Sequence, residues 1–599
     1  MNSSTPRPAA PAASTAAGPG TRAGGHRARG EHRRRTRRLA TALAAALALV
    51  LAACGAIPVD GPVGTSAPND AVQDEFQYAF SPPGPAQDAS PEQIIEGFYT
   101  AGIAPKDDYS TAREFLSPEL ARNWKATTRT LVYESVPNIV GNVEEDSYTV
   151  ELAVSASIDE HGIMTRNSPS AIASVQFRLV EVDGQWRIAE APDGTLVEQG
   201  NFSALFAPYP LYFYDSTHTY AIPDYRWYAN RQSVAATLVE SLLAGPAPYL
   251  RNAAVSAFPE GGSLARASVP VDGRRATVDL VESVFLDTTE LARQLMQQQL
   301  ELTLDGVSNI AAVTMTVEQR PVSLGNVSPD FEPAVENPSV PNTQVAIADG
   351  ALVYYQGNGV VPVGGVEDIS GFSPRDPAMA PGGNRYAFLS QDRTRLMTID
   401  DAGRVRTAAT GTGLLAPSID IHGWTWTVDG GDDTKVMAVP ADTERDGQVR
   451  EVAAEWMEGA TVTSLRISRD GARAVVTARV DGDAGVFVTG VIRDTDGVPR
   501  GFTEPLELGT NIPATQAVWD SATSVIAMQA NDEQPVQAER ITLAGGNETF
   551  QPLLGMTNIS AGPGEQRTVY AETPEGVFSR VSNVWKRQDG QASYLSYPG

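Results

Sequence analysis

The chain contains a single thiol, and the residues before it favour one specific modification. Cys54 is the only cysteine among 599 residues, and it directly follows Leu51, Ala52 and Ala53. Small side chains at these positions allow a peptidase to bind the backbone in an extended form and to cut before the cysteine. The thiol itself can take a diacylglyceryl group. This spacing therefore predicts cleavage between Ala53 and Cys54 and a lipid on the Cys54 sulfur.

The residues before Cys54 have the composition of an export signal. Residues 1–30 are rich in Ala, Pro, Gly, Ser and Thr, which predicts disorder. Five arginines within residues 33–38 precede an apolar run over residues 39–53. This run is shorter than the roughly 20 residues that span a membrane, so we interpret residues 1–53 as a secretory signal peptide with a disordered basic extension. Its end resembles a bacterial lipobox. A membrane anchor with an incidental cysteine is the alternative, and the export route, Sec or Tat, stays open.

The charge of the chain excludes one class of partner. The net charge is −27, although the first 53 residues contain nine arginines and one glutamate, so the part after the signal is more acidic still. A protein with this charge does not neutralise phosphates, and anionic lipids repel it. We therefore expect no nucleic-acid partner, and we expect the membrane to be held through the N-terminal lipid.

Few residues that could catalyse a reaction remain once Cys54 carries a lipid. One cysteine excludes an internal disulfide, a CxxC pair and a cysteine zinc site. The three histidines after the signal, His161, His218 and His422, are more than 50 residues apart. The sequence has no GxSxG, Walker A, SxxK or dinucleotide motif. We predict no catalytic residue, no cofactor and no metal site. A cell-wall hydrolase with two acting carboxylates is the enzymatic alternative.

A tether and a first folded unit follow the lipidated cysteine. Residues 54–89 are rich in Pro, Gly and Asp, which predicts a flexible tether. The unit at residues 90–197 begins with Ser90, a helix cap, followed by a proline and an acidic residue. Alternating strands follow, two of them joined by the turn Asp183-Gly184. Helices followed by a curved antiparallel sheet resemble an NTF2-like (cystatin-like) α+β cone.

A second α+β unit is predicted over residues 198–327. Its expected elements are a helix over 233–243 capped by Ser233, a helix over 289–304, and strands over 276–280 and 311–317. The order Leu-Leu-Ala-Gly-Pro, Phe-Pro-Glu-Gly, Ala-Thr-Val-Asp-Leu, a Gln-rich helix and Val-Thr-Met-Thr-Val is similar to the GerMN domain. That resemblance implies no active-site residue.

After a linker at residues 328–343 the chain changes to short alternating strands. A weak unit of turn residues and an apolar strand recurs about every 40 to 50 residues, which is the period of a four-stranded propeller blade. Its copies begin near residues 379, 416, 467, 517 and 559. We predict an all-β propeller of about six blades over residues 344–599, with turns that resemble those of TolB-like propellers. A two-sheet sandwich is the alternative.

The order of lipobox, tether, NTF2-like unit, GerMN unit and propeller, with the start Cys54-Gly55-Ala56-Ile57-Pro58, closely resembles the actinobacterial LpqB family. Membership would imply a lipid-anchored protein on the extracytoplasmic face of the cell membrane. It would also imply a non-catalytic accessory role in the MtrAB two-component system, through contact with the extracellular domain of the sensor kinase MtrB. No contact residue can be carried over. An envelope module that binds a glycan or a peptide is the other non-enzymatic hypothesis.

Overall fold

The computed structural model describes residues 82–105, 108–142, 146–166, 172–231, 233–326, 331–357, 359–430, 434–440, 448–563 and 568–599. The predicted signal peptide, the lipobox residues Leu51, Ala52 and Ala53, Cys54 and nearly all of the predicted tether lie outside the described residues. Within the described ranges, no helix is both long enough and apolar enough to cross a membrane.

The first unit begins with the short helices α2 (Pro91–Ala101), α3 (Ser110–Arg113) and α4 (Pro118–Asn123). Helix α2 starts as expected, because the Ser90 hydroxyl accepts a hydrogen bond from the Gln93 N–H and the Gln93 side chain accepts one from the Ser90 N–H. The Ser117 hydroxyl caps α4 by accepting from the Leu120 N–H. Local capping therefore fixes where two of these helices begin.

Seven strands form the sheet of this unit: β1 (Thr130–Tyr133), β2 (Asn138–Asn142), β3 (Ser147–Ile158), β4 (Met164–Arg166), β5 (Ile172–Val182), β6 (Gln185–Glu190) and β7 (Thr195–Glu198). Strand β3 pairs antiparallel with β1, β2, β4 and β5, while β1 and β7 run parallel. Alternate residues of β3 face a core in which Phe98 packs edge-on against Trp124 and Phe177. The assignment of this unit as an NTF2-like cone stays a prediction.

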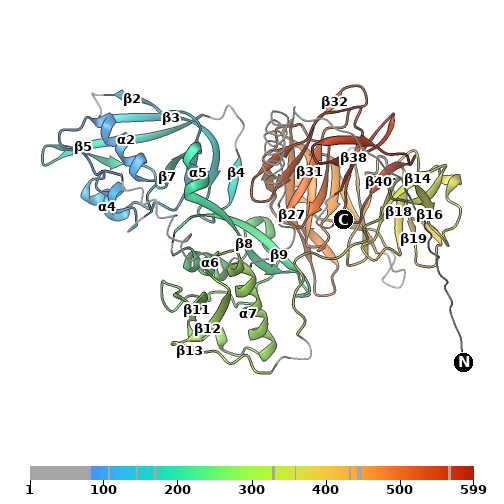
Figure 1. Ribbon diagram of the computed structural model, residues 1–599, viewed down its shortest axis with the longest axis horizontal. Coiled ribbons are helices and arrows are strands. Elements are labelled where there is room, and N and C mark those ends of the chain that lie inside the picture. Colours follow the sequence, from blue (N-terminus) through green and yellow to red (C-terminus); the bar gives the residue numbers. More distant parts are fainter. Residues whose placement is uncertain are drawn as a thin grey trace, which may run out of the picture. The chain divides into compact units, whose positions relative to one another are not determined.

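The second unit joins a two-stranded ribbon to a helix-covered sheet. The ribbon consists of β8 (Phe206–Tyr214) and β9 (Ala221–Ala229), and it follows α5 (Gln199–Leu205). The sheet has the order β10 (Val271–Asp272), β11 (Arg275–Leu280), β12 (Ala312–Val317) and β13 (Arg320–Pro321). Its helices are α6 (Val234–Leu243) and α7 (Glu290–Asp305), with the 3-10 helices η1 (Pro248–Leu250) and η2 (Glu282–Phe285). Helix α7 connects the parallel strands β11 and β12 (Figure 1), so the predicted α+β GerMN architecture is confirmed.

One detail of this unit differs from the sequence-based expectation. Helix α6 follows Ser233, but the Ser233 side chain makes no capping hydrogen bond. The reason is conformational, because Ser233 has φ −88° and ψ 8° in place of the extended backbone that aims a cap hydroxyl at the first turn. Packing holds this helix, since Leu238, Val239 and Leu242 are fully buried.

The remaining strands form six antiparallel blades and one two-stranded sheet in the described part of the chain. The first two blades contain β14 (Gln344–Ala348), β15 (Ala351–Tyr355), β16 (Val360–Pro362) and β40 (Ser593–Ser596), then β17 (Arg375–Met379), β18 (Tyr386–Leu389), β19 (Arg395–Ile399) and β20 (Val405–Thr410). The third contains β21 (Ser418–Ile419), β22 (Trp424–Asp429), β23 (Lys435–Pro440) and β24 (Arg450–Val452). The fourth contains β25 (Thr461–Ile467), β26 (Arg473–Val480), β27 (Asp483–Arg493), β28 (Pro499–Phe502) and β29 (Leu506–Leu508).

The last two blades complete the set. The fifth contains β30 (Gln516–Ser521), β31 (Ser524–Met528), β33 (Ala538–Thr542) and β34 (Asn547–Thr549), and the sixth contains β36 (Asn558–Ala561), β37 (Val569–Thr573), β38 (Gly576–Val581) and β39 (Val584–Arg587). Between them, β32 (Pro535–Val536) pairs with β35 (Leu553–Leu554). The short helices η3 (Ser370–Phe372) and η4 (Glu455–Met457) lie in connections.

The ring closes by pairing its two ends. Strand β40 pairs antiparallel with β14, with Val345 opposite Ser596, so the first blade contains strands from both ends of the propeller sequence. The innermost strands β40, β17, β21, β25, β30 and β36 contact one another in turn around the ring. The predicted repeat units fall on the hairpins that join the first and second strands of blades two to six. The propeller of about six blades is therefore confirmed, and the sandwich alternative was wrong.

Candidate functional site

The sequence-predicted reactive residues are not gathered by the fold. Cys54 and its lipobox lie outside the described residues. His161 is exposed beside Glu160, His218 lies against the Tyr214 ring at 5.4 Å, and His422 belongs to a propeller turn. Among the described residues, no group of three or more His, Cys, Asp or Glu side chains is placed to hold a metal ion. The structure therefore directs attention to interfaces and cavities.

The ribbon β8–β9 and η1 share one apolar core with the propeller. Phe213 and Leu250 from the second unit belong to the same buried cluster as Val475, Val488 and Trp519 from blades four and five, and each is at most 3% exposed. Gly490 lies so close to η1 and the turn after it that an added Cβ would be 3.0 Å from the Tyr249 carbonyl oxygen and 2.5 Å from the Ala253 Cβ. The GerMN unit and the propeller therefore meet at a continuous, close-packed junction.

Polar groups of the GerMN unit and of the propeller also form hydrogen bonds with each other across this junction. The Thr503 hydroxyl of the propeller donates to the Tyr249 carbonyl at 2.6 Å, and the Trp227 indole N–H donates to the Ala544 carbonyl at 3.1 Å. Buried hydrogen bonds of this kind cost free energy when one partner is removed. They add geometric specificity to the apolar contact.

A buried ion pair lies on strand β9, near the middle of the ribbon. Arg226 donates to Asp224 at 2.6 Å, and the side chains are 4% and 0% exposed. Asp224 also accepts from the Ala247 N–H and the Tyr249 hydroxyl. Burial alone would lower the pKa of Arg226, but the neighbouring Asp224 carboxylate raises it above its ordinary value. Arg226 is therefore a permanent cation within the fold.

The first unit touches the same ribbon. The Arg226 guanidinium donates to the His161 carbonyl at 2.8 Å, and the backbone N–H of Trp227 donates to the Gly162 carbonyl at 2.7 Å. Gly162 has φ +79°, and a Cβ there would lie 3.2 Å from Arg226 and from Tyr228. The turn after β3 therefore fits only a glycine, and all three units contact the ribbon.

Three aspartates lie near the first turn of neighbouring blades. Asp420 and Asp470 directly follow or lie just after the first strands of blades three and four, Asp520 lies at the end of the first strand of blade five, and each is at most 2% exposed. Each has an arginine partner: Asp420 with Arg493 at 2.5 Å, Asp470 with Arg473 at 2.5 Å and Asp520 with Arg540 at 2.8 Å. Blades three, four and five therefore each bury an aspartate beside an arginine, which comes from the next blade for Asp420 and from the same blade for the other two.

The Asp470 pair shows how the surroundings fix the charge. Burial alone would raise the pKa of Asp470. The charge of Arg473 and its hydrogen bond, together with the Ser468 hydroxyl and the Ala472 N–H, hold the pKa of Asp470 below its ordinary value. The lowered pKa keeps this carboxylate ionised, and its oxygens already accept hydrogen bonds from Arg473, Ser468 and Ala472.

His422 lies beside these pairs. Burial and the positive charge of Arg493 lower the pKa of His422, and the carboxylates Asp420, Asp215 and Asp470 offset this only in part. Asp215 belongs to the GerMN unit, between the strands of the ribbon. His422 is therefore a neutral side chain at the junction between the two units.

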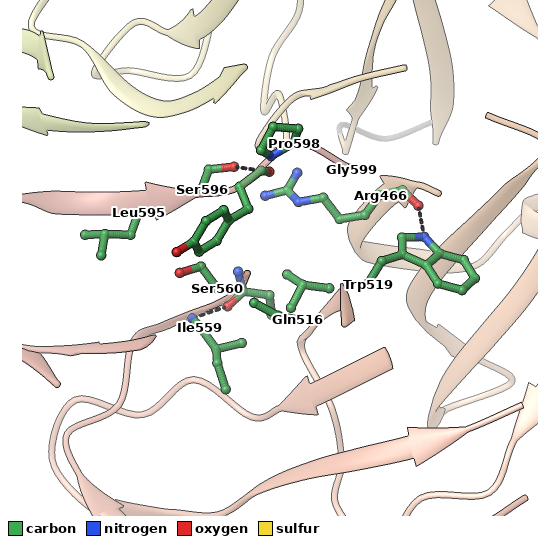
Figure 2. Close-up of a pocket in the computed structure, with 12 residues that line it drawn as sticks. Arg466, Gln516, Trp519, Ile559, Ser560, Leu595, Ser596, Pro598 and Gly599 are labelled. Carbon is green, nitrogen blue, oxygen red and sulfur yellow. Dashed lines mark hydrogen bonds between the residues drawn. The ribbon is translucent and has the colours of Figure 1, made fainter. Parts of the chain in front are cut away.

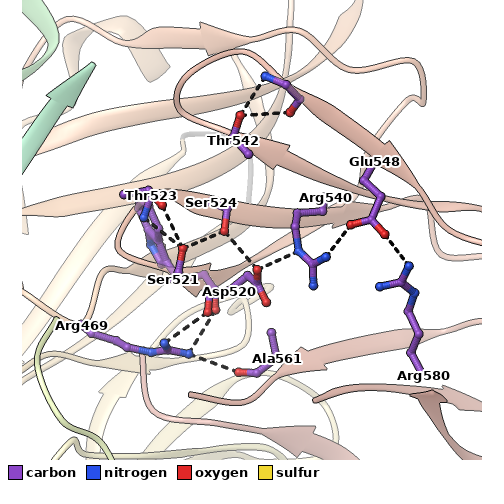
Figure 3. Close-up of polar contacts among 12 residues, drawn as sticks. Arg469, Asp520, Ser521, Thr523, Ser524, Arg540, Thr542, Glu548, Ala561 and Arg580 are labelled. Atoms are coloured by element: carbon purple, nitrogen blue, oxygen red, sulfur yellow. Dashed lines mark hydrogen bonds and ion pairs between the residues drawn. The ribbon is translucent and has the colours of Figure 1, made fainter. Parts of the chain in front are cut away.

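The Asp520 pair extends into a longer network (Figure 3). Asp520 accepts from Ser524 and Arg540, Arg540 donates to Glu548, and Glu548 accepts from Arg580 of the sixth blade. Arg469 donates to the carbonyl groups of Asp520 and Ala561. These contacts join blades five and six, which is a structural role.

Two cavities stand out in the described part of the molecule. The first lies in the central channel, has a volume of about 20 Å³ and is lined by Arg466, Gln516, Ser560 and Tyr597 among others (Figure 2). The second is an open groove of about 370 Å³ beside β32, lined mainly by amide side chains and prolines. No Asp or Glu side chain lines either of these two cavities, so neither holds the pair of side-chain carboxylates that glycan hydrolysis requires.

Sequence reasoning missed the residues of the junction and of the channel. Asp420, Asp470 and Asp520 lie within the predicted repeat units, and their regular spacing of 50 residues was the available signal. No local pattern marks Arg466, because its cavity is built by strands from several blades.

Three family models match consecutive parts of the chain. The model described as "Lipoprotein LpqB, N-terminal domain" matches residues 84–203. The one described as "Sporulation and spore germination" matches residues 210–323, and "Lipoprotein LpqB beta-propeller domain" matches residues 350–598.

Two solved structures are similar in parts. TolB from Acinetobacter baumannii is 15% identical, with a TM-score of 0.31, over 43% of this chain and 66% of that chain. The first GerMN domain of the sporulation protein GerM from Bacillus subtilis is 16% identical, with a TM-score of 0.18, over 22% of this chain and 97% of that chain.

Curated relatives match nearly the whole chain. Lipoprotein LpqB of Thermobifida fusca (strain YX) is 26% identical over 618 residues, covering 92% of this chain and 97% of the relative. Lipoprotein LpqB of Bifidobacterium longum (strain NCC 2705) is 26% identical over 497 residues, covering 79% and 82%. With family models for its N-terminal unit and its propeller in the same order as the folded units, the chain belongs to the LpqB family of lipoproteins.

Proposed function

We propose that this protein is a non-catalytic accessory of the MtrAB two-component system that contacts the extracellular domain of the sensor kinase MtrB. Membership of a lipoprotein family implies a membrane-anchored protein. A lipid on Cys54 would hold the folded units on the extracytoplasmic face, in the same membrane as the kinase. Confinement to one membrane raises the effective concentration of the two partners, so a weak contact suffices.

The observation that carries the proposal is the junction at the ribbon β8–β9. Three units that share one buried cluster and several buried hydrogen bonds behave as one scaffold, because separating them would expose apolar area and unpaired polar groups. A scaffold of this kind suits docking. Occupancy would bias the receptor between signalling states through differential binding.

The surface that we assign to this contact is the outward face of the first sheet. Val140 is 51% exposed and Ile172 is 73% exposed, on the strands that flank β3. Val140 lies opposite Thr149, and Ile172 lies opposite Ala153, so both point away from the core-facing residues of β3. Among the described strands, β2 pairs only with β3, which leaves an edge for a partner strand.

The test uses point variants, because deleting the GerMN unit would strip the propeller of part of its core. The double variant Val140→Asp, Ile172→Asp should reduce capture of the MtrB extracellular domain by at least about tenfold. The matched control Val581→Asp, Val584→Asp changes two exposed valines on blade six, 55% and 67% exposed, and should capture normally. Equal capture by the unchanged chain and both variants would show that this surface does not bind MtrB. No capture by the unchanged chain would contradict the proposed function itself.

Anchoring is tested separately at Cys54. The variant Cys54→Ser should keep the folded units intact but release them from the membrane. It should also weaken kinase modulation, because the gain in effective concentration is lost. Full membrane retention and activity of this variant would show that something other than the lipid holds the protein.

A second candidate function rests on the groove beside β32. Four amide side chains, Gln529, Asn531, Gln534 and Gln537, line it together with Pro535 and Pro552. Amides donate and accept hydrogen bonds without charge, which suits a neutral glycan or a peptide. A rise in melting temperature with soluble peptidoglycan fragments, abolished by Gln534→Ala, would favour an envelope-binding module.

A further inference from the structure

Met164 differs in exposure from the other methionines that the structure describes. It lies on β4 and is only partly buried. The others are each at most 8% exposed: Met296, Met315, Met379, Met397, Met437, Met457, Met528 and Met556. A peroxide that reaches the thioether sulfur of a methionine converts it to a sulfoxide. Exposure therefore singles out Met164 as the methionine that an oxidant from solution meets first.

The end of the Met164 side chain contacts the propeller. Gly545 lies in the turn between β33 and β34 of the fifth blade and has φ +83°. A Cβ added at Gly545 would lie 1.9 Å from the Met164 Cε and 3.6 Å from its Sδ. The thioether therefore lies against a backbone that leaves no room for one further carbon atom. Such a contact is sensitive to any increase in the size of the Met164 side chain.

A second glycine of the propeller lies against the same strand. Gly509 follows β29 of the fourth blade, and a Cβ added there would lie 2.5 Å from the Arg166 Cβ. Strands β4 and β29 contact each other. Because Gly509 and Gly545 belong to neighbouring blades, β4 is a place where the first unit meets the propeller directly, and Met164 lies within that contact.

Met164 also packs against an apolar cluster that the first unit shares with the ribbon. The buried members of this cluster are Ile158, Val197 and Phe206. Trp227 packs against the same cluster, and its indole N–H donates to the carbonyl of Ala544, the residue before Gly545. Met164 therefore lies where the first unit, the ribbon and the propeller come together, in surroundings that suit an apolar side chain.

Oxidation changes the Met164 side chain in size and in polarity. Hydrogen peroxide transfers one oxygen atom to Sδ: its O–O bond breaks, an S–O bond forms and water leaves, so that the sulfur is oxidised and the peroxide is reduced. The sulfoxide is larger than the thioether and needs hydration or a hydrogen-bond donor. It therefore fits poorly between the apolar cluster and the closely placed Gly545 turn.

We propose that Met164 is a modification site, at which oxidation to the sulfoxide by a peroxide loosens the first unit from the propeller. The first unit itself stays folded, because Met164 lies outside the core cluster that contains Phe98, Trp124 and Phe177. Reduction of the sulfoxide returns the thioether, so the contact between the two units can form again.

The test treats the full chain in detergent with dilute hydrogen peroxide and follows each methionine by peptide mass. Met164 should gain one oxygen atom before any buried methionine does. The backbone N–H of Trp227, which donates to the Gly162 carbonyl of the first unit, should then exchange with deuterium at least about fivefold faster. Oxidation of Met164 no faster than that of the buried methionines, or unchanged exchange at Trp227 after oxidation, would overturn the proposal.

Three variants separate the sulfur from the shape of the side chain. Met164→Leu has a similar volume but no sulfur, so exchange at Trp227 should stay slow with and without peroxide. Met437→Leu, the matched change at a buried position, should respond to peroxide as the unchanged chain does. Met164→Gln places a polar group at the contact and should speed exchange without peroxide. A peroxide response that persists in Met164→Leu, or slow exchange in Met164→Gln, would contradict the proposal.

Discussion

The propeller buries arginines in two different surroundings. One is the set of turns that join the first and second strands of blades three to five, here called the turn face, and the other is the central channel. On the turn face, Arg473 and Arg493 are 0% and 3% exposed, and each contacts an aspartate at 2.5 Å. In the channel, Arg466 is buried to a similar degree and contacts carbonyl groups only. The first arrangement balances the charge with an aspartate, and the second has no ion pair with an Asp or Glu side chain among the described residues.

This difference distinguishes buried charges that hold the structure together from buried charges that could attract a ligand. Charges that are paired inside the chain fix the turns and offer a ligand little net charge, because the carboxylate and the guanidinium neutralise each other. A charge that lacks a partner keeps its attraction for an anion. Buried charge alone is therefore a poor indicator of a site, and the pairing of that charge is a better one.

The largest predicted effect comes from making Arg473 resemble Arg466. Asp470→Asn removes the counter-charge of a fully buried guanidinium, so the free energy of unfolding should fall by about 3–5 kcal/mol. Urea denaturation measures the loss. Asp494→Asn, which breaks the exposed pair with Arg500, is the control and should cost about 1 kcal/mol or less. Equal losses in the two variants would contradict the distinction.

The next effect tests how tightly the propeller packs against the GerMN unit at their junction. Gly490→Ala places a Cβ 2.5 Å from the Ala253 Cβ and 3.0 Å from the Tyr249 carbonyl, so the two units must shift apart. We expect a loss of about 1–3 kcal/mol in the free energy of unfolding. Gly364→Ala, where nothing lies within 4 Å, should be close to neutral. A neutral Gly490→Ala would mean that the junction is loose.

Local features of the fold were predictable from the sequence. The cap at Ser90 and the turn at Asp470-Gly471 depend on neighbours a few residues away, so composition and spacing reveal them. The period of the propeller is visible for the same reason. Even here context intervenes, because Ser233 precedes a helix yet makes no capping hydrogen bond.

The sites themselves depend on contacts that no local pattern records. The bond from Trp227 to Ala544 joins residues 317 positions apart, and the Ser560 to Gln344 bond joins residues 216 apart. The need for glycine at position 490 comes from η1 of another unit. Such contacts appear only when the blades and the ribbon are placed in space, so the junction and the channel could not be predicted.

A smaller effect concerns pH. The folded pKa of His422 lies below the ordinary value of 6.5, so the unfolded chain binds a proton more readily. The contribution of neutral His422 is present above pH 6.5 and is lost as the pH falls below it. His422→Gln should therefore flatten the fall in stability between pH 7 and roughly pH 5.5, measured by urea denaturation. His161→Gln, at an exposed position, is the control. An unchanged slope in His422→Gln would show that His422 does not titrate at the junction.

The smallest effect tests one hydrogen bond at the edge of the junction. Trp227→Phe keeps an aromatic ring but removes the N–H that donates to the Ala544 carbonyl, so the loss should be about 1 kcal/mol. Combined with Gly490→Ala it should give a measurable coupling energy, because both changes act on the same packed interface. Strict additivity of the two losses would mean that the ribbon contacts the propeller at independent points, and the description of one continuous junction would then be wrong.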